Sequence, residues 1–209
     1  MALKPSYDTR VFLNVPFDRR YESLFAALIA GLVYLGKRPT CVLEVPAEGA
    51  IRKDRILDQI RSCAMSIHDL SRVQYKTIHG ARLPRFNMPF ELGLAIAVSK
   101  LDRRRPEHGV VLLEERNHRL PVTLSDVNGL DAHVHEGTQI GIAACLLDTF
   151  GGGGPDELER MTSLARSVSR FLADRKRAYN LESIYRRDLF EQAISTATDK
   201  AELQQAQGG

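Results

Sequence analysis

The feature that most constrains the fold is an alternation of short apolar segments with longer segments of helical spacing. The short segments predict buried strands, and the longer ones predict helices that bury one face or, in one case, nearly all faces. The expected strands cover residues 10–15, 39–45, 64–70 and 110–113, with weaker strands over 121–126 and 131–135. The expected helices cover residues 20–35, 52–62, 87–100 and 138–150. This alternation predicts an α/β fold with a mainly parallel, Rossmann-like (flavodoxin-like) sheet and helices on both faces.

A run of four glycines, Gly151–Gly154, marks the clearest boundary along the chain. Pro155 and the acids after it are typical of a helix start, and two amphipathic stripes follow. We therefore expect an α/β domain over residues 1–150, which binds a nucleoside or nucleotide. A glycine linker with a C-terminal helical extension follows over 151–209. These helices pack onto the main domain or a second copy, or they dock to another protein.

The composition excludes several classes of protein. The three cysteines show no paired spacing, which argues against a disulfide scaffold and a zinc site and favours a reducing compartment. The longest apolar run, residues 24–35, is too short to span a bilayer, which takes about 20 residues. The first residues show no apolar signal segment. We expect a cytoplasmic protein with no membrane partner and no bound metal.

The net charge of +3 is unevenly distributed. Residues 151–209 carry nine basic and nine acidic side chains, so the whole excess lies in residues 1–150. No acid occurs between Asp69 and Glu91, an interval that contains Arg72, Lys76, Arg82 and Arg85. The field is too small for a dedicated nucleic-acid-binding protein, so no direct nucleic-acid binding is expected. It favours a small phosphorylated ligand.

Two familiar nucleotide-binding motifs are missing. The turn after the first strand, residues 14–20, contains no glycine, whereas a dinucleotide fingerprint needs glycines there for the backbone to approach a pyrophosphate. No Walker loop occurs in the sequence. Ordinary NAD-dependent dehydrogenases and P-loop NTPases are therefore excluded, and no cofactor is expected.

Polar residues follow the expected strands, where ligands bind in parallel sheets. Asp69 and Ser71 end the third strand and would face the ligand, or one of them caps a following helix. Their neighbour His68 points the other way and is expected to be a structural histidine. Glu44, after the second strand, is either a second acid of the site or a surface residue.

The segment around Glu91 is the most informative. Asn87 is expected to cap a helix whose first turn contains Pro89 and Glu91, which places Glu91 in the crevice at the strand ends. A carboxylate there can stabilise or attack an anomeric carbon. The alternative is that Glu91 completes a capping box.

Three segments together resemble the nucleoside 2-deoxyribosyltransferase-like group, which is related to TIR-like NAD-cleaving domains. They are VFLNVPFD (11–18), IRSCAMSIHDLS (60–71) and PRFNMPFELGLAIA (84–97), and the resemblance covers residues 10–150. It implies that Glu91 is the nucleophile, that Asp69 contacts the sugar and that Pro16 and Phe17 form the base-side turn. Asn14 and Val15 depart from the small residue and glycine usual before Pro-Phe.

The resulting hypothesis is an N-glycosidase or deoxyribosyltransferase-like enzyme that cleaves a nucleoside, a nucleotide or an NAD-type ligand, with Glu91 and Asp69 as the catalytic residues. The expected substrate-binding residues are Asn14, Pro16, Phe17, Asp18, Ser71, Arg85, Asn87 and Met88. The resemblance also implies a homo-oligomer, because related enzymes complete their sites across subunits. The alternative is a TIR-like module that senses a nucleotide without cleaving it and signals to a partner, as in bacterial defence. A third possibility is a scaffold that dimerises through its C-terminal helices.

Overall fold

The computed structural model describes residues 6–44, 51–72, 76–78, 81–83, 86–102, 108–116 and 131–207. It contains two compact units. The first, here called the sheet unit, combines Met1–Pro16 with Ala47–Glu136, and the second, the helical unit, combines Phe17–Pro46 with Gly137–Gly209. The predicted domain boundary at residue 151 does not coincide with this division, because the helical unit combines residues 17–46 and 137–150 with the C-terminal helices. The boundary therefore stays a prediction.

The sheet unit is built on parallel strands in the order β1-β3-β6-β7. Their bounds are β1 Arg10–Asn14, β3 Met65–Asp69, β6 Gly109–Glu114 and β7 Ala132–Val134. These strands confirm the α/β class with a parallel sheet. The expected strand over 121–126 lies outside the described residues.

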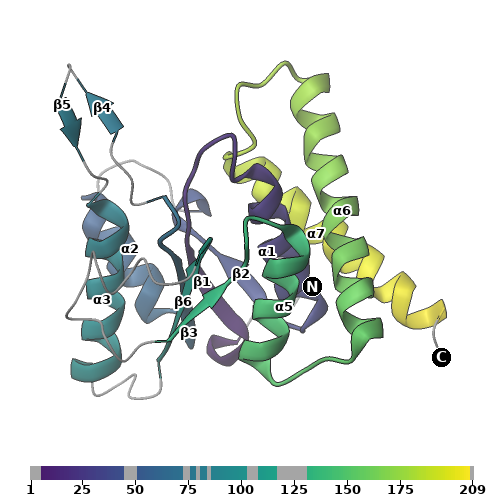
Figure 1. The fold of residues 1–209 in the computed structure, drawn as a ribbon, viewed down its shortest axis with the longest axis horizontal. Helices are drawn as coiled ribbons and strands as arrows, with labels where there is room; N and C mark the ends of the chain where they lie inside the picture. Colours follow the sequence, from purple (N-terminus) through teal and green to yellow (C-terminus); the bar gives the residue numbers. More distant parts are fainter. Residues whose placement is uncertain are drawn as a thin grey trace. The chain divides into compact units, whose positions relative to one another are not determined.

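Two helices of the sheet unit, α2 (Arg52–Arg61) and α3 (Asn87–Leu101), lie side by side (Figure 1). Helix α3 packs against β1, β3 and β6. Its Leu92 forms a buried apolar cluster with Leu70 and Leu112. Between β3 and α3 the chain forms an antiparallel hairpin of β4 (Lys76–Ile78) and β5 (Ala81–Leu83), which the sequence analysis did not predict. A short 3-10 helix, η1 (Tyr7–Thr9), precedes β1.

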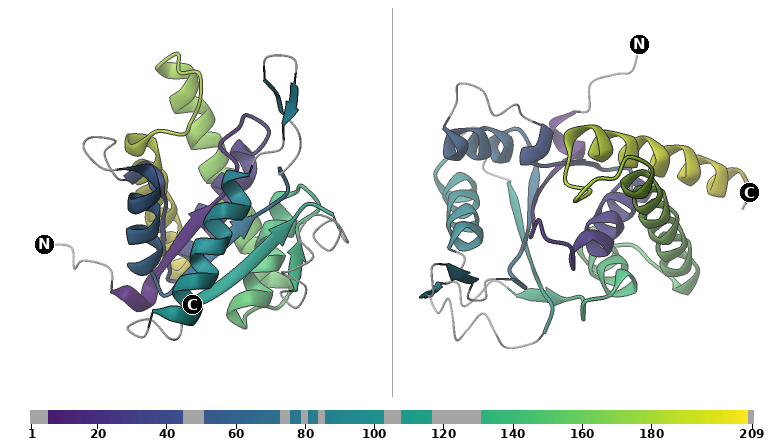
Figure 2. Two further views of the ribbon diagram at one scale, coloured as in Figure 1. Left: turned by 90° about the vertical axis from the view of Figure 1, so that its left-hand side faces the viewer. Right: turned by 90° about the horizontal axis from the view of Figure 1, so that it is seen from above.

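The helical unit is organised around α1 (Glu22–Tyr34), which packs against α5 (Gln139–Phe150), α6 (Pro155–Ala178) and α7 (Arg187–Gln207) (Figure 2). This position explains why the sequence of α1 is apolar on nearly all sides. Gly31 allows the close approach of α5, because a Cβ there would lie 2.5 Å from Leu146 Cδ1. Helix α6 thus packs against α1 and α5, which come earlier in the chain. This agrees with one of the expected alternatives, in which the C-terminal helices pack onto the preceding part of the protein.

The strand expected over residues 39–45 is wrong in its length. Strand β2 covers only Arg38–Thr40, and a 3-10 helix, η2, follows over Val42–Glu44. The Glu44 carboxylate causes this turn, because it accepts hydrogen bonds from the Cys41 backbone N–H (3.2 Å) and the Arg38 guanidinium (2.8 Å). Glu44 is therefore held within the helical unit.

The glycine run ends one helix and begins the next. Gly151 has φ +70° and caps α5 by donating its N–H to the Leu147 carbonyl. Gly154 precedes α6, which begins at Pro155 as the sequence predicts. Within the described ranges, no helix has both the length and the apolar character that crossing a membrane requires.

Candidate functional site

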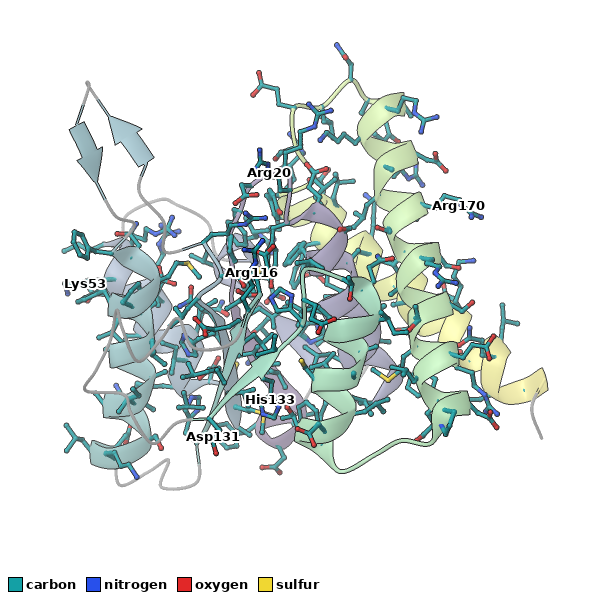
Figure 3. The ribbon with its side chains drawn as sticks, in the orientation of Figure 1. Arg20, Lys53, Arg116, Asp131, His133 and Arg170 are labelled. Carbon is teal, nitrogen blue, oxygen red and sulfur yellow. The ribbon has the colours of Figure 1, made fainter. Side chains whose placement is uncertain are left out.

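Buried polar side chains gather where the strands of the sheet unit end. Asn14 ends β1, Asp69 ends β3, Glu114 ends β6, and His135 directly follows β7, all of them almost fully buried. Figure 3 shows Arg116, just beyond β6, at this carboxyl edge, and Asp131, just before β7, at the opposite edge. The polar residues expected after the strands thus lie at the carboxyl edge of the sheet, and ligand binding there stays a prediction.

One polar cluster consists of Asp69, Ser71 and His135. The Asp69 Oδ1 atom accepts a hydrogen bond from the Ser71 backbone N–H (2.8 Å), and Oδ2 lies 3.0 Å from His135 Nε2. Ser71 Oγ lies 2.9 Å from the same His135 nitrogen. The expected alternative, a helix cap, does not apply, because a hairpin rather than a helix follows Ser71.

This cluster has the residue types of a Ser-His-Asp triad but not its geometry. In a triad, the serine and the carboxylate contact opposite nitrogens of the imidazole, so that the histidine can take the serine proton. Here both contact Nε2. A carboxylate only accepts hydrogen bonds, so Nε2 carries a proton and cannot serve as a base for Ser71. In this arrangement, Ser71 is not an activated nucleophile.

A second cluster lies along the α3 side of β3. The Asn14 Nδ2 atom lies 2.9 Å from His68 Nδ1 and 3.2 Å from the Met88 carbonyl oxygen. His68 Nε2 lies 2.9 Å from Ser66 Oγ. Burial, together with the nearby His108, lowers the pKa of His68 to about 3. His68 is therefore a neutral structural histidine, as expected.

Glu91 lies in the same region of α3 as Met88, one turn further along the helix, and is 7% exposed. It is the fifth residue of α3, beyond the first turn, so it does not complete a capping box. Its carboxylate oxygen Oε1 lies 3.8 Å from a guanidinium nitrogen of Arg52, whose side chain is 58% exposed. Burial raises the pKa of Glu91 to about 7, and Arg52 opposes this rise.

The expected cap at Asn87 is wrong. Phe86 is the residue before the helix, and no side chain caps it. Phe86 already has helical dihedral angles (φ −76°, ψ −15°), whereas a capping side chain needs an extended residue at that position. Asn87 is instead the first residue of α3 and is exposed.

The residues of the base-side turn are divided between the units. Pro16 is buried at the end of a sheet-unit segment, whereas Phe17 and Asp18 belong to the helical unit. The Phe17 ring stacks on Tyr185 with ring centroids 4.9 Å apart. The Asp18 carboxylate accepts hydrogen bonds from the backbone N–H groups of Arg20 (3.0 Å) and Tyr21 (3.2 Å). Arg85 lies outside the described residues.

The structure therefore brings Asn14 to Met88, one turn before Glu91 in α3, and separately brings Asp69 to Ser71. His68 and Asp69 are neighbours in β3 and point to opposite faces, so the two clusters flank the end of this strand. Sequence reasoning missed His135 and Arg52 as partners. The signal for His135 was weak, since it ends a polar segment after a short strand.

The sequence matches no protein-family model and no curated protein. In the described part of the chain, no group of three or more His, Cys, Asp or Glu residues is arranged to hold a metal ion. The fold and the site thus define a parallel α/β protein with a buried acid beside the carboxyl edge of its sheet.

Proposed function

We propose that the protein cleaves the N-glycosidic bond of a nucleoside, a nucleotide or an NAD-type ligand, with Glu91 as the nucleophile. The observation that carries this proposal is the environment of Glu91. Its carboxyl group is buried, caps no helix and lies 3.8 Å from an exposed guanidinium, a distance longer than a hydrogen bond. Such a carboxyl is costly to bury and is typical of a catalytic acid or nucleophile.

The proposed reaction has two steps. A Glu91 carboxylate oxygen bonds to C1′ while the bond from C1′ to the base nitrogen breaks, and the base leaves with the electron pair. A purine or pyrimidine base leaves as an anion and takes a proton from water, whereas the nicotinamide of an NAD-type ligand leaves as a neutral molecule and takes none. Water then cleaves the glycosyl ester, which restores the carboxylate and releases a proton, or a second base accepts the sugar. The attack needs the ionised carboxylate, and with its pKa of about 7 Glu91 is ionised above neutral pH.

We assign Asp69 the role of a positioning residue, in addition to the expected contact with the sugar, which stays a prediction. Both of its oxygens contact protein groups, namely the Ser71 backbone N–H and His135 Nε2. These contacts fix the turn in which β3 ends. Ser71, whose backbone is held by this turn, stays a candidate for hydrogen bonding to the ligand.

A phosphate on the ligand is favoured by Arg72, the residue after Ser71. Its Nε atom is buried and has no hydrogen-bond partner among the described residues. A buried donor without a partner costs about 1–3 kcal/mol, and a phosphate oxygen would remove this cost. Arg72 also begins the acid-free basic interval of the sequence. We therefore propose that nucleotides are better substrates than nucleosides.

The test is incubation of the protein with NAD, nucleotides, ribonucleosides and deoxynucleosides, followed by chromatography for released base. We expect release by the parent protein and by Glu182→Gln, a matched variant at an exposed glutamate. We expect a loss of at least about a hundredfold in Glu91→Gln. Tight nucleotide binding without turnover, unaffected by Glu91→Gln, would instead support the sensing module.

A further inference from the structure

A continuous chain of hydrogen bonds runs through the interior of the sheet unit and ends at Asn14. From the Cys63 carbonyl it passes to His108 Nδ1 (3.0 Å), and from His108 Nε2 to Ser66 Oγ (3.0 Å). It continues from Ser66 Oγ to His68 Nε2 (2.9 Å), and from His68 Nδ1 to Asn14 Nδ2 (2.9 Å). Its four side chains are at most 3% exposed.

The two ends of the chain fix the direction of every bond in it. Carbonyl oxygens only accept, so the Asn14 atom 3.2 Å from the Met88 carbonyl must be the amide nitrogen. For the same reason, His108 Nδ1 must carry a proton and donate it to the Cys63 carbonyl. The orientation of the Asn14 amide and the tautomer of His108 are thereby settled by chemistry.

The interior bonds follow from these ends. Asn14 donates to His68 Nδ1, so His68 carries its proton on Nε2 and donates to Ser66 Oγ. Ser66 then donates its hydroxyl proton to His108 Nε2. All of these groups are satisfied only when both histidines are neutral. Burial lowers the pKa of each of them, which agrees with this arrangement.

These hydrogen bonds determine which atom of the Asn14 side chain remains for a ligand. Both hydrogens of its amide nitrogen are used, one by His68 and one by Met88, so only the carbonyl oxygen Oδ1 is left. That oxygen accepts hydrogen bonds and cannot donate one. Asn14 ends β1 and contacts the Met88 carbonyl in the first turn of α3, one turn before Glu91. A ligand group at this place must therefore be a donor.

We infer that Asn14 Oδ1, oriented by the chain through Ser66, accepts a hydrogen bond from the sugar 2′-hydroxyl, so that the protein selects ribosyl over 2′-deoxyribosyl substrates. This inference rests on the proposed function. Among the sugar hydroxyls, the one on C2′ is nearest to the anomeric carbon that Glu91 attacks. A site built to bind a hydroxyl rejects the analogue that lacks it, because the buried acceptor is left without a partner.

The experiment compares kcat/KM for three pairs of compounds: adenosine and 2′-deoxyadenosine, inosine and 2′-deoxyinosine, and AMP and dAMP. We expect the parent protein to prefer the ribosyl compound by at least about tenfold. Ser66→Ala interrupts the series of hydrogen bonds at a residue that does not contact the ligand. It should raise KM for the ribosyl compound and remove most of the preference, with little effect on the deoxy compound.

Ser62→Ala is the matched control, because the Ser62 hydroxyl donates to the Gln59 carbonyl outside the chain. It should keep the ribosyl preference even if it lowers stability as much as Ser66→Ala does. Equal cleavage of both members of each pair by the parent protein, or an unchanged preference in Ser66→Ala, would overturn the inference and leave the proposed function intact. No base release from any compound would overturn both.

A second measurement tests the chain without activity and without a variant that must fold. Nitrogen-15 NMR of the histidine rings at neutral pH should show His68 protonated on Nε2 and His108 on Nδ1, with both rings neutral. A proton on His68 Nδ1 would contradict the direction of the chain and refute the role assigned to Asn14.

Discussion

The contact between Arg52 and Glu91 lowers the pH at which the proposed nucleophile ionises, against the larger effect of burial, and it can be removed by Arg52→Gln. Two unit charges 3.8 Å apart interact with about 1 kcal/mol in bulk water and about 4 kcal/mol at the effective dielectric constant of a protein surface. Arg52 is 58% exposed, so the lower value applies. At about 1.4 kcal/mol per pKa unit, the loss of Arg52 should raise the pKa of Glu91 further, by roughly 0.7 units.

The assay is the pH dependence of kcat/KM for base release. Because the ionised carboxylate attacks, the rate should rise with pH through about 7 in the parent protein. In Arg52→Gln the inflection should move upward by roughly 0.5–1 pH unit. In 1 M NaCl the parent inflection should move in the same direction, since salt screens the exposed pair.

Lys53→Gln is the matched control. It removes the same charge from the next residue of α2, where Lys53 pairs with Asp54 rather than with Glu91. Its pH profile should coincide with that of the parent protein. An unchanged inflection in Arg52→Gln, or an equal shift in Lys53→Gln, would refute the assignment of this inflection to Glu91.

Three further predictions concern stability and reactivity. The raised pKa of Glu91 in the folded state means that the free energy of unfolding of the parent protein falls as pH rises from about 4.5 to about 7. Glu91→Gln lacks this fall, so in urea titrations at pH 8 its free energy of unfolding should exceed that of the parent protein by on the order of 3 kcal/mol. If the free energies of unfolding of the two proteins changed equally with pH, the burial argument would be contradicted. Tyr185→Phe removes the 2.7 Å hydrogen bond to the Asp18 carbonyl and should lower the free energy of unfolding by about 1 kcal/mol in the same assay; no change would show that this bond is not stabilising. Burial raises the pKa of Cys41, and all three cysteines are buried, so iodoacetamide at pH 8 should label the protein in urea and not in its native state; rapid native labelling would contradict the burial.

The strands of the sheet unit could be predicted from the sequence because they are buried and almost continuously apolar. The expected strands at 10–15, 64–70 and 110–113 agree with β1, β3 and β6 to within two residues. The hairpin of β4 and β5 was missed because its strands have only three residues each, too few for an alternating pattern. The length of β2 was overestimated because side-chain hydrogen bonds of Glu44 bend the chain there.

The candidate site was predictable in its position and not in its contacts. Asn14, Asp69 and Ser71 follow strands, and the rule that polar residues at strand ends face the ligand identified them. Their partners depend on the tertiary fold, which brings His135 to Asp69 and Arg52 to Glu91 from distant parts of the sequence. The alternation of side chains along the strand predicted that His68 and Asp69 point to opposite sides of β3, but not the partners on each side.

The most direct test of the proposed function is the rate of base release by the parent protein and by Glu91→Gln under identical conditions. The measurement is chromatography of free base after incubation with NAD, AMP and adenosine at pH 8, where the Glu91 carboxyl is ionised. The proposal predicts release by the parent protein and a rate at least about a hundredfold lower in the variant. Equal rates for the two proteins would show that Glu91 is not the nucleophile.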